Sequence, residues 1–60
     1  MKKIVILDFG NGEVYVYDYD SGRYDDAGDF VDYLHEIGDI GSGQNNCQWM
    51  VVEDLKINIK

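Results

Sequence analysis

Apolar and polar residues follow a two-residue period in the first third of the chain. Residues 2–9 are rich in β-branched side chains and predict a first strand. In residues 13–20, valines alternate with tyrosines, which predicts a second strand. The Asn11-Gly12 pair between them predicts a tight hairpin turn, because Asn-Gly accepts the positive φ angles that such a turn requires.

A helical period replaces this alternation after residue 24. Asp25 or Asp26 is suited to cap the N-terminus of a helix, and Gly38 is suited to end it. The predicted apolar stripe of this helix consists of Phe30, Val31, Leu34 and Ile37. The residues at 38–46 are mostly Gly, Ser and Asn, and they predict a loop.

Alternation returns near the C-terminus, and Glu53-Asp54 interrupts it, so we expect a bulge or a short turn there. The apolar odd positions are Cys47, Trp49, Val51, Leu55, Ile57 and Ile59. The predicted order is ββαβ, or ββαββ if the last segment is split. We therefore expect an α+β fold in a single domain spanning residues 1–60. It contains a β-hairpin, and one helix packs on one face of a three- or four-stranded, mainly antiparallel sheet.

The hairpin register decides which side chains share a face of the sheet. A two-residue turn at Asn11-Gly12 would place Phe9 opposite Val14, whereas a three-residue turn would mix the two kinds of residue. In the first register one face carries Val5, Leu7, Phe9, Val14 and Val16. The other face carries Ile4, Ile6, Tyr15, Tyr17 and Tyr19. We expect the helix on the valine face. The tyrosine face would then be covered by the chain's own C-terminal segment or by another chain.

Charge limits the range of partners. Twelve acidic residues against five basic ones give a net charge of −7, which disfavours direct binding to nucleic acid or to a membrane surface and favours basic protein surfaces. The predicted helix contains no Lys or Arg to neutralise its acids. Carboxylates at helical spacing lie about 5–6 Å apart, close to the spacing of phosphates along a strand. The acids that share or border this helix face are Asp25, Asp29, Asp32, Glu36 and Asp39. A solvated face that only keeps the protein soluble is the alternative.

Several kinds of chemistry find little support. The single cysteine permits no disulfide within the chain and fits a reducing, cytoplasmic setting. We expect no cofactor. We also expect no metal, because an EF-hand loop counted from Asp18 would lack the glycine at its sixth position. We expect Cys47 in the core and His35 on the surface rather than a catalytic pair. The apolar run after Lys3 is too short for a signal sequence, and no stretch reaches the length of a membrane span.

In size, acidity and lack of catalytic motifs, the chain resembles the loose class of phage-encoded inhibitors of bacterial defence systems, which includes anti-CRISPR proteins. The resemblance implies a partner such as a nuclease or a CRISPR effector complex. The hypothesis is a non-enzymatic inhibitor that covers a basic, nucleic-acid-binding site with the acids named above. The aromatic anchors would be Tyr15, Tyr17 and Tyr19. One alternative is a small homodimeric accessory domain that buries its tyrosine face between two copies. A small enzyme or metal module is the other.

Overall fold

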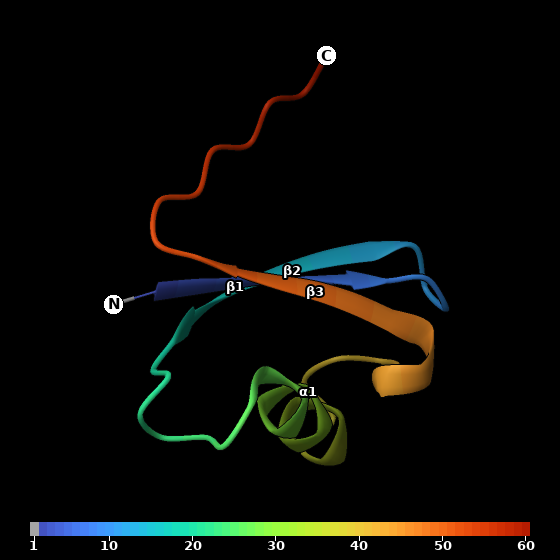
Figure 1. The fold of residues 1–60 in the computed structure, drawn as a ribbon. Helices are drawn as coiled ribbons and strands as arrows, with labels where there is room; N and C mark the ends of the chain where they lie inside the picture. The colour runs from blue at the N-terminus through green and yellow to red at the C-terminus, as the bar shows by residue number, and fades with distance from the viewer. Residues whose placement is uncertain (1) are drawn as a thin grey trace.

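A three-stranded antiparallel sheet with one helix on one face forms the body of the protein (Figure 1). The structure, a computed structural model, describes residues 2–60. Along the chain the elements are β1 (Lys2–Asp8), β2 (Glu13–Tyr19), α1 (Ala27–Glu36), a 3-10 turn η1 (Gln44–Asn46) and β3 (Cys47–Val52). The strand order in the sheet is β2-β1-β3. The predicted α+β fold and the ββαβ order are confirmed.

The hairpin between β1 and β2 is wider than predicted. Asp8 pairs with Glu13, so the loop contains the four residues 9–12 rather than only Asn11-Gly12. The Asp8 carboxylate closes this loop by accepting hydrogen bonds from the backbone N–H and the side-chain amide of Asn11, both at 3.1 Å. The register therefore differs from the predicted one by two residues along β2. Because side chains alternate with a period of two, each still lies on its predicted face.

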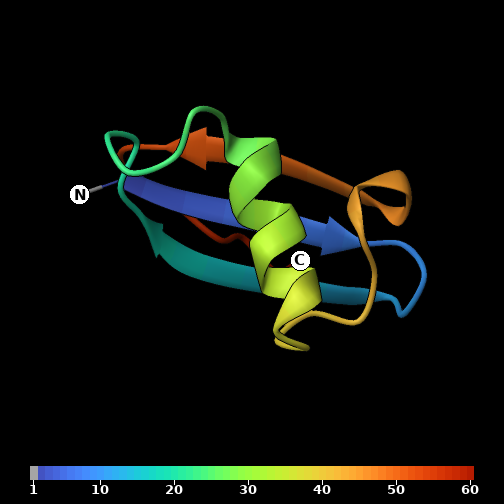
Figure 2. The same ribbon diagram turned by 90° about the horizontal axis from the view of Figure 1, so that it is seen from below.

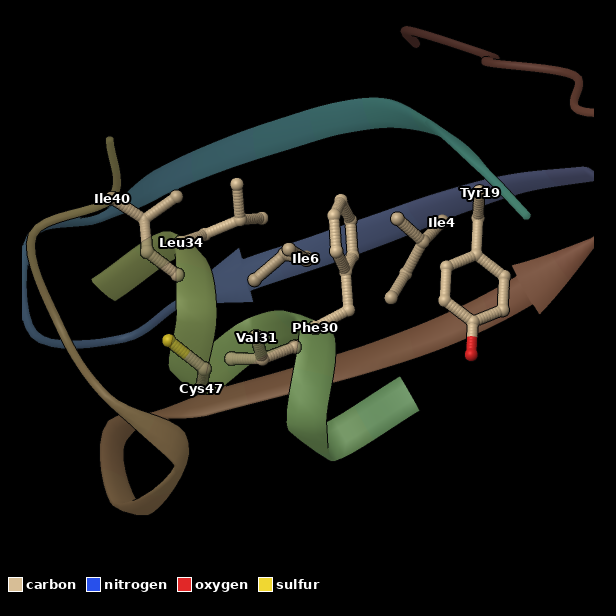
Figure 3. Packing of buried hydrophobic residues seen from close by; sticks show 8 residues of the cluster. All are labelled: Ile4, Ile6, Tyr19, Phe30, Val31, Leu34, Ile40 and Cys47. Atoms are coloured by element: carbon tan, nitrogen blue, oxygen red, sulfur yellow. The ribbon is translucent and has the colours of Figure 1, made fainter. Parts of the chain in front are cut away.

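The helix covers the opposite face of the sheet from the one predicted. It packs against the isoleucines of β1 and the tyrosines of β2. Figure 3 shows this packing with Ile4, Ile6 and Tyr19. The buried cluster consists of Ile4, Ile6, Tyr19, Phe30, Val31, Leu34, Ile40 and Cys47. The Phe30 ring explains the choice of face, because it lies 5.8 Å from Tyr17, 5.6 Å from Tyr19 and 4.9 Å from Tyr24, centroid to centroid. An aromatic side chain buries about 150–250 Å², so the tyrosine face offers the helix more apolar area than the valines do.

Both ends of α1 agree with the sequence. The Asp26 side chain caps the N-terminus by accepting a 3.0 Å hydrogen bond from the Asp29 backbone N–H. Gly38 follows the last turn with φ of +78°, and the next N–H, that of Asp39, donates to the Leu34 carbonyl at 2.9 Å. Ile37 departs from the predicted stripe, because it lies past the last turn and is exposed. Seen from below, α1 crosses the strands steeply, beginning near β3 and ending near β2 (Figure 2).

The C-terminal segment does not form the fourth strand that was one of the two predicted arrangements. β3 ends at Val52, and residues 55–60 are extended without a partner strand within residues 2–60. We call residues 55–60 the C-terminal arm. Figure 1 shows the arm leaving the sheet on the side opposite α1. On that side lies the open face of the sheet, made of Val5, Leu7, Val14, Val16, Met50 and Val52.

Candidate functional site: the acidic helix face

The acidic helix face is formed by three carboxylates of α1 and one on each side of it. Asp29, Asp32 and Glu36 lie within α1, whereas Asp25 precedes the capping residue and Asp39 follows Gly38. All five are exposed. With 3.6 residues per turn, the three helical acids fall within an arc of about 60°, on the side of α1 that faces away from the sheet. The predicted spacing on one helix face therefore holds for these three.

No basic side chain within residues 2–60 forms an ion pair with any of these acids. The one ion pair within residues 2–60 lies elsewhere, where Lys3 of β1 pairs with Asp18 of β2. The hydrogen bond and the charge of Lys3 hold the pKa of Asp18 below its usual value. No ion pair within residues 2–60 therefore offsets the acids of this face, and an approaching basic partner can interact with them.

Two of the five acids are engaged within the protein. The Tyr17 hydroxyl donates a 2.7 Å hydrogen bond to Asp39, and the Gln44 amide donates a 2.8 Å hydrogen bond to Asp32. Gln44 also donates to the Gly28 carbonyl at 3.2 Å, which holds η1 against the helix. These contacts leave Asp25, Asp29 and Glu36 as the acids whose carboxylates accept no hydrogen bond from residues 2–60.

The three tyrosines predicted as aromatic anchors lie on the core side of the sheet. Tyr19 is buried, and Tyr15 and Tyr17 are half-buried against the cluster under α1. Burial is the largest cause that raises the pKa of Tyr17 to about 12, and the contact with Asp39 adds to it. A dimer interface built from the tyrosine face would require α1 to leave it. These residues therefore hold the fold together rather than lying open to a partner.

Tyr33 is an exposed aromatic residue that the sequence analysis did not single out. It lies in α1 one turn after Asp29 and one turn before Glu36, and 47% of its side chain is exposed. On a helix these three share one face. The signal was present in the sequence, because Tyr33 falls outside the apolar stripe and follows Asp29 by four residues. The acidic helix face thus carries its own aromatic side chain.

A second polar cluster lies at the other end of the sheet, around the buried Asp8. Asn11 contacts both Asp8 and, at 3.5 Å, the Ser42 hydroxyl, so the cluster ties the hairpin loop to the segment before β3. Burial alone would raise the pKa of Asp8, but hydrogen bonds from Ser42, Asn11 and Gly10 outweigh it and lower the pKa. Its acceptor positions are used within the fold, so Asp8 serves to join the hairpin loop to the segment before β3.

Cys47 and His35 occupy the places predicted for them. Cys47 is buried and its thiol donates to the Ser42 carbonyl at 3.5 Å, whereas His35 is exposed. Burial, with a smaller contribution from the charge of Asp8, raises the pKa of the Cys47 thiol, which disfavours the thiolate that a nucleophile needs. Within residues 2–60, no three His, Cys, Asp or Glu side chains are grouped so that they could hold a metal ion.

Comparison of the chain with protein-family models, with curated proteins and with solved structures found no match. Within the part of the chain that the structure describes, no helix combines the length and the apolar character that a bilayer crossing requires. Functional inference therefore depends on the acidic helix face and on the uncovered side of the sheet.

Proposed function

We propose that this protein is a non-catalytic inhibitor that binds a basic, nucleic-acid-binding surface of a partner protein through its acidic helix face. The observation that carries the proposal is a row of exposed helical carboxylates with no basic side chain paired to them within residues 2–60. A solvated helix usually mixes the two signs of charge, because i,i+4 pairs of opposite charge stabilise it. A single-sign face gives up that stabilisation and gains an attraction for cationic grooves.

The geometry of the face suits a groove that normally holds a nucleic-acid strand. Asp29, Asp32 and Glu36 project from one helix, so the Cβ atoms of successive acids lie about 5–6 Å apart, close to the spacing of successive phosphates. Tyr33 lies among them and can insert beside the basic side chains of the partner, in the manner of the aromatic anchors found at protein interfaces. The partner class is a nuclease or a guide-RNA effector complex of a bacterial defence system.

A charge-reversal experiment tests this proposal. Asp29→Lys with Glu36→Lys reverses two carboxylates that accept no hydrogen bond from residues 2–60, so the fold should tolerate the change. Immobilised wild-type protein should retain a nucleic-acid-binding protein from a bacterial lysate, and competing DNA or RNA should release it. The double variant should lose that retention. Salt should weaken the wild-type complex steeply, because the attraction is between exposed charges.

A matched control changes the same number of charges elsewhere. Glu53→Lys with Asp54→Lys alters two exposed acids in the turn after β3, away from α1. This control should bind as the wild type does. Equal loss of binding in both double variants would show that net charge, not the helix face, is responsible. Equal retention in both would refute the proposal.

A further inference from the structure

The side of the sheet opposite α1 has no cover within residues 2–60. Of its apolar side chains, Leu7, Val14, Val16 and Met50 are exposed, and only the central Val5 is buried by its neighbours. A shallow hollow on this face is lined by Val5, Leu7, Gln48, Trp49 and Met50. A contiguous apolar surface on such a small protein usually marks an interaction site.

The C-terminal arm is the second apolar surface without cover. Its apolar residues Leu55, Ile57 and Ile59 alternate with polar ones, and Ile57 and Ile59 are 67% and 93% exposed. This two-residue period is typical of a strand that packs one side on an apolar surface. The arm rises obliquely from the sheet on the side of the open face, and its C-terminal end stands clear above the middle of the sheet (Figures 1 and 2).

We propose that the open face binds the open face of a second copy of this chain, and that each C-terminal arm packs along the sheet of the partner. Stacked sheets lie about 10 Å apart, and a six-residue extended arm reaches about 20 Å. An arm of this length that rises from the end of its own sheet (Figure 1) therefore crosses the gap and reaches the edge of the partner's sheet. Such a contact is isologous, with the same surfaces used twice.

Area shows why the arms are needed. Three strands of six or seven residues present a flat outline of about 14 Å by 20 Å. A stable interface buries about 800 Å² of accessible surface on each partner, and a flat outline of about 280 Å², even with the relief of its side chains, supplies only part of that area. Each arm adds apolar area from Leu55, Ile57 and Ile59 to the interface, and the two copies contribute one arm each.

Charge also favours this mode of association. The acidic helix faces of two copies repel each other, so two chains approach best through the side that carries fewest acids. Within β1, β2 and β3, the only charged side chains on the open face are Lys3 and Asp18, which pair with each other at one end. The arm carries Lys56 and Lys60, two of the five basic residues of the chain, and brings them to a partner of net negative charge.

Sedimentation velocity of the full chain tests the proposal, from about 1 μM to about 1 mM. The wild type should sediment as a dimer, and Met50→Lys should raise the dissociation constant at least about 30-fold, as expected when a charge replaces an apolar anchor of an interface. Removal of residues 55–60 should have a similar effect. Ile37→Lys is the matched control, because Ile37 is 56% exposed, close to the 52% of Met50, but lies at the end of α1. This control should remain dimeric.

Circular dichroism would verify the fold of each variant, and Val16→Lys replaces Met50→Lys if the latter unfolds. A direct readout comes from a mixture of isotope-labelled and unlabelled wild-type protein. Intermolecular NOEs should join the methyl group of Met50 to methyl groups on the open face of the other copy, and those of the arm to the partner's sheet. A monomer at every concentration, with the arm free or folded on its own sheet, would overturn the proposal. A dimer that Met50→Lys leaves intact, or that Ile37→Lys dissociates equally, would also overturn it.

Discussion

The Tyr17 hydroxyl donates a 2.7 Å hydrogen bond to the Asp39 carboxylate and so joins β2 to the segment that follows α1. Sequence analysis had assigned both residues to partner binding, one as an aromatic anchor and one as an acid. In the structure each is a partner of the other, and the Tyr17 ring also packs edge-on against Phe30. The pair fixes the end of the helix to the sheet, next to the positive-φ residue Gly38.

Removal of the Tyr17 hydroxyl should weaken this connection. Tyr17→Phe keeps the ring and its packing on Phe30, so we expect a loss of about 1 kcal/mol from the free energy of unfolding. A domain of this size has about 3–9 kcal/mol in total, and urea denaturation resolves such a loss. Tyr33→Phe is the control, because the Tyr33 hydroxyl makes no hydrogen bond to residues 2–60. Equal stability of the two variants would mean that the bond contributes nothing in solution.

The same contact predicts how Tyr17 titrates. Burial and the neighbouring Asp39 raise its pKa to about 12 from the 10.0 of a free tyrosine. The unfolded chain therefore loses the Tyr17 proton first, and the contribution to stability is present below pH 10 and is lost as the pH rises through 12. Asp39→Asn should lower the pKa of Tyr17 part of the way toward 10, because burial still raises it. NMR titration of the tyrosine ring carbons would measure both values, and an unchanged pKa in Asp39→Asn would contradict the contribution of Asp39.

The fold class followed from side-chain periods, whereas the choice of covered face did not. Strand alternation and the helical stripe depend on local backbone geometry, which each segment carries in its own sequence. The face that α1 covers depends on the sum of all contacts across the sheet. Phe30 packs with three tyrosines at once, and no single segment reveals that sum.

The hairpin and the candidate site show the same division. Asn11-Gly12 has the composition of a two-residue turn. The loop is longer because Asp8, which precedes it, accepts two hydrogen bonds from Asn11. The acids of the helix were predictable, because exposure of carboxylates follows from the helical period. The expectation that the helix covers the valine face was wrong, and the tyrosines lie under the helix because their exposure depends on the face that it covers.

Acid should loosen the loop cluster around Asp8. The hydrogen bonds to its carboxylate hold the pKa below the ordinary 3.8 of an aspartate. Asp8 therefore contributes stability that is present above pH 3.8 and is lost as the pH falls through the lowered pKa. In Asp8→Asn this contribution should be absent. The variant should be less stable at neutral pH, and its free energy of unfolding should fall less steeply as the pH is lowered. Chemical denaturation between neutral and acid pH would measure the difference. If the free energies of unfolding of the two proteins fell equally with pH, this role of Asp8 would be contradicted.

Gly38 should resist substitution because of its backbone angle. Its φ of +78° places it in the left-handed region, although a Cβ built there would contact no atom within 4 Å. Strain alone should therefore make Gly38→Ala less stable by about 1 kcal/mol, and Gly38→Asn should be milder, because Asn tolerates this region. Gly22 is the control, because a Cβ there meets only the Asp20 side chain, at 3.4 Å. Gly22→Ala should leave the thermal midpoint unchanged or raise it.

The two proposed surfaces lie on opposite sides of the protein, so together they predict a stoichiometry. A dimer formed through the open faces leaves both helices on its outer sides, where each acidic face can bind one partner molecule. The mass of the complex with the partner should correspond to two copies of each chain. Met50→Lys should convert it to a one-to-one complex with the affinity of each helix face unchanged. If Met50→Lys instead abolished partner binding, the open face itself would contribute to that contact, and the separation of the two surfaces would be wrong.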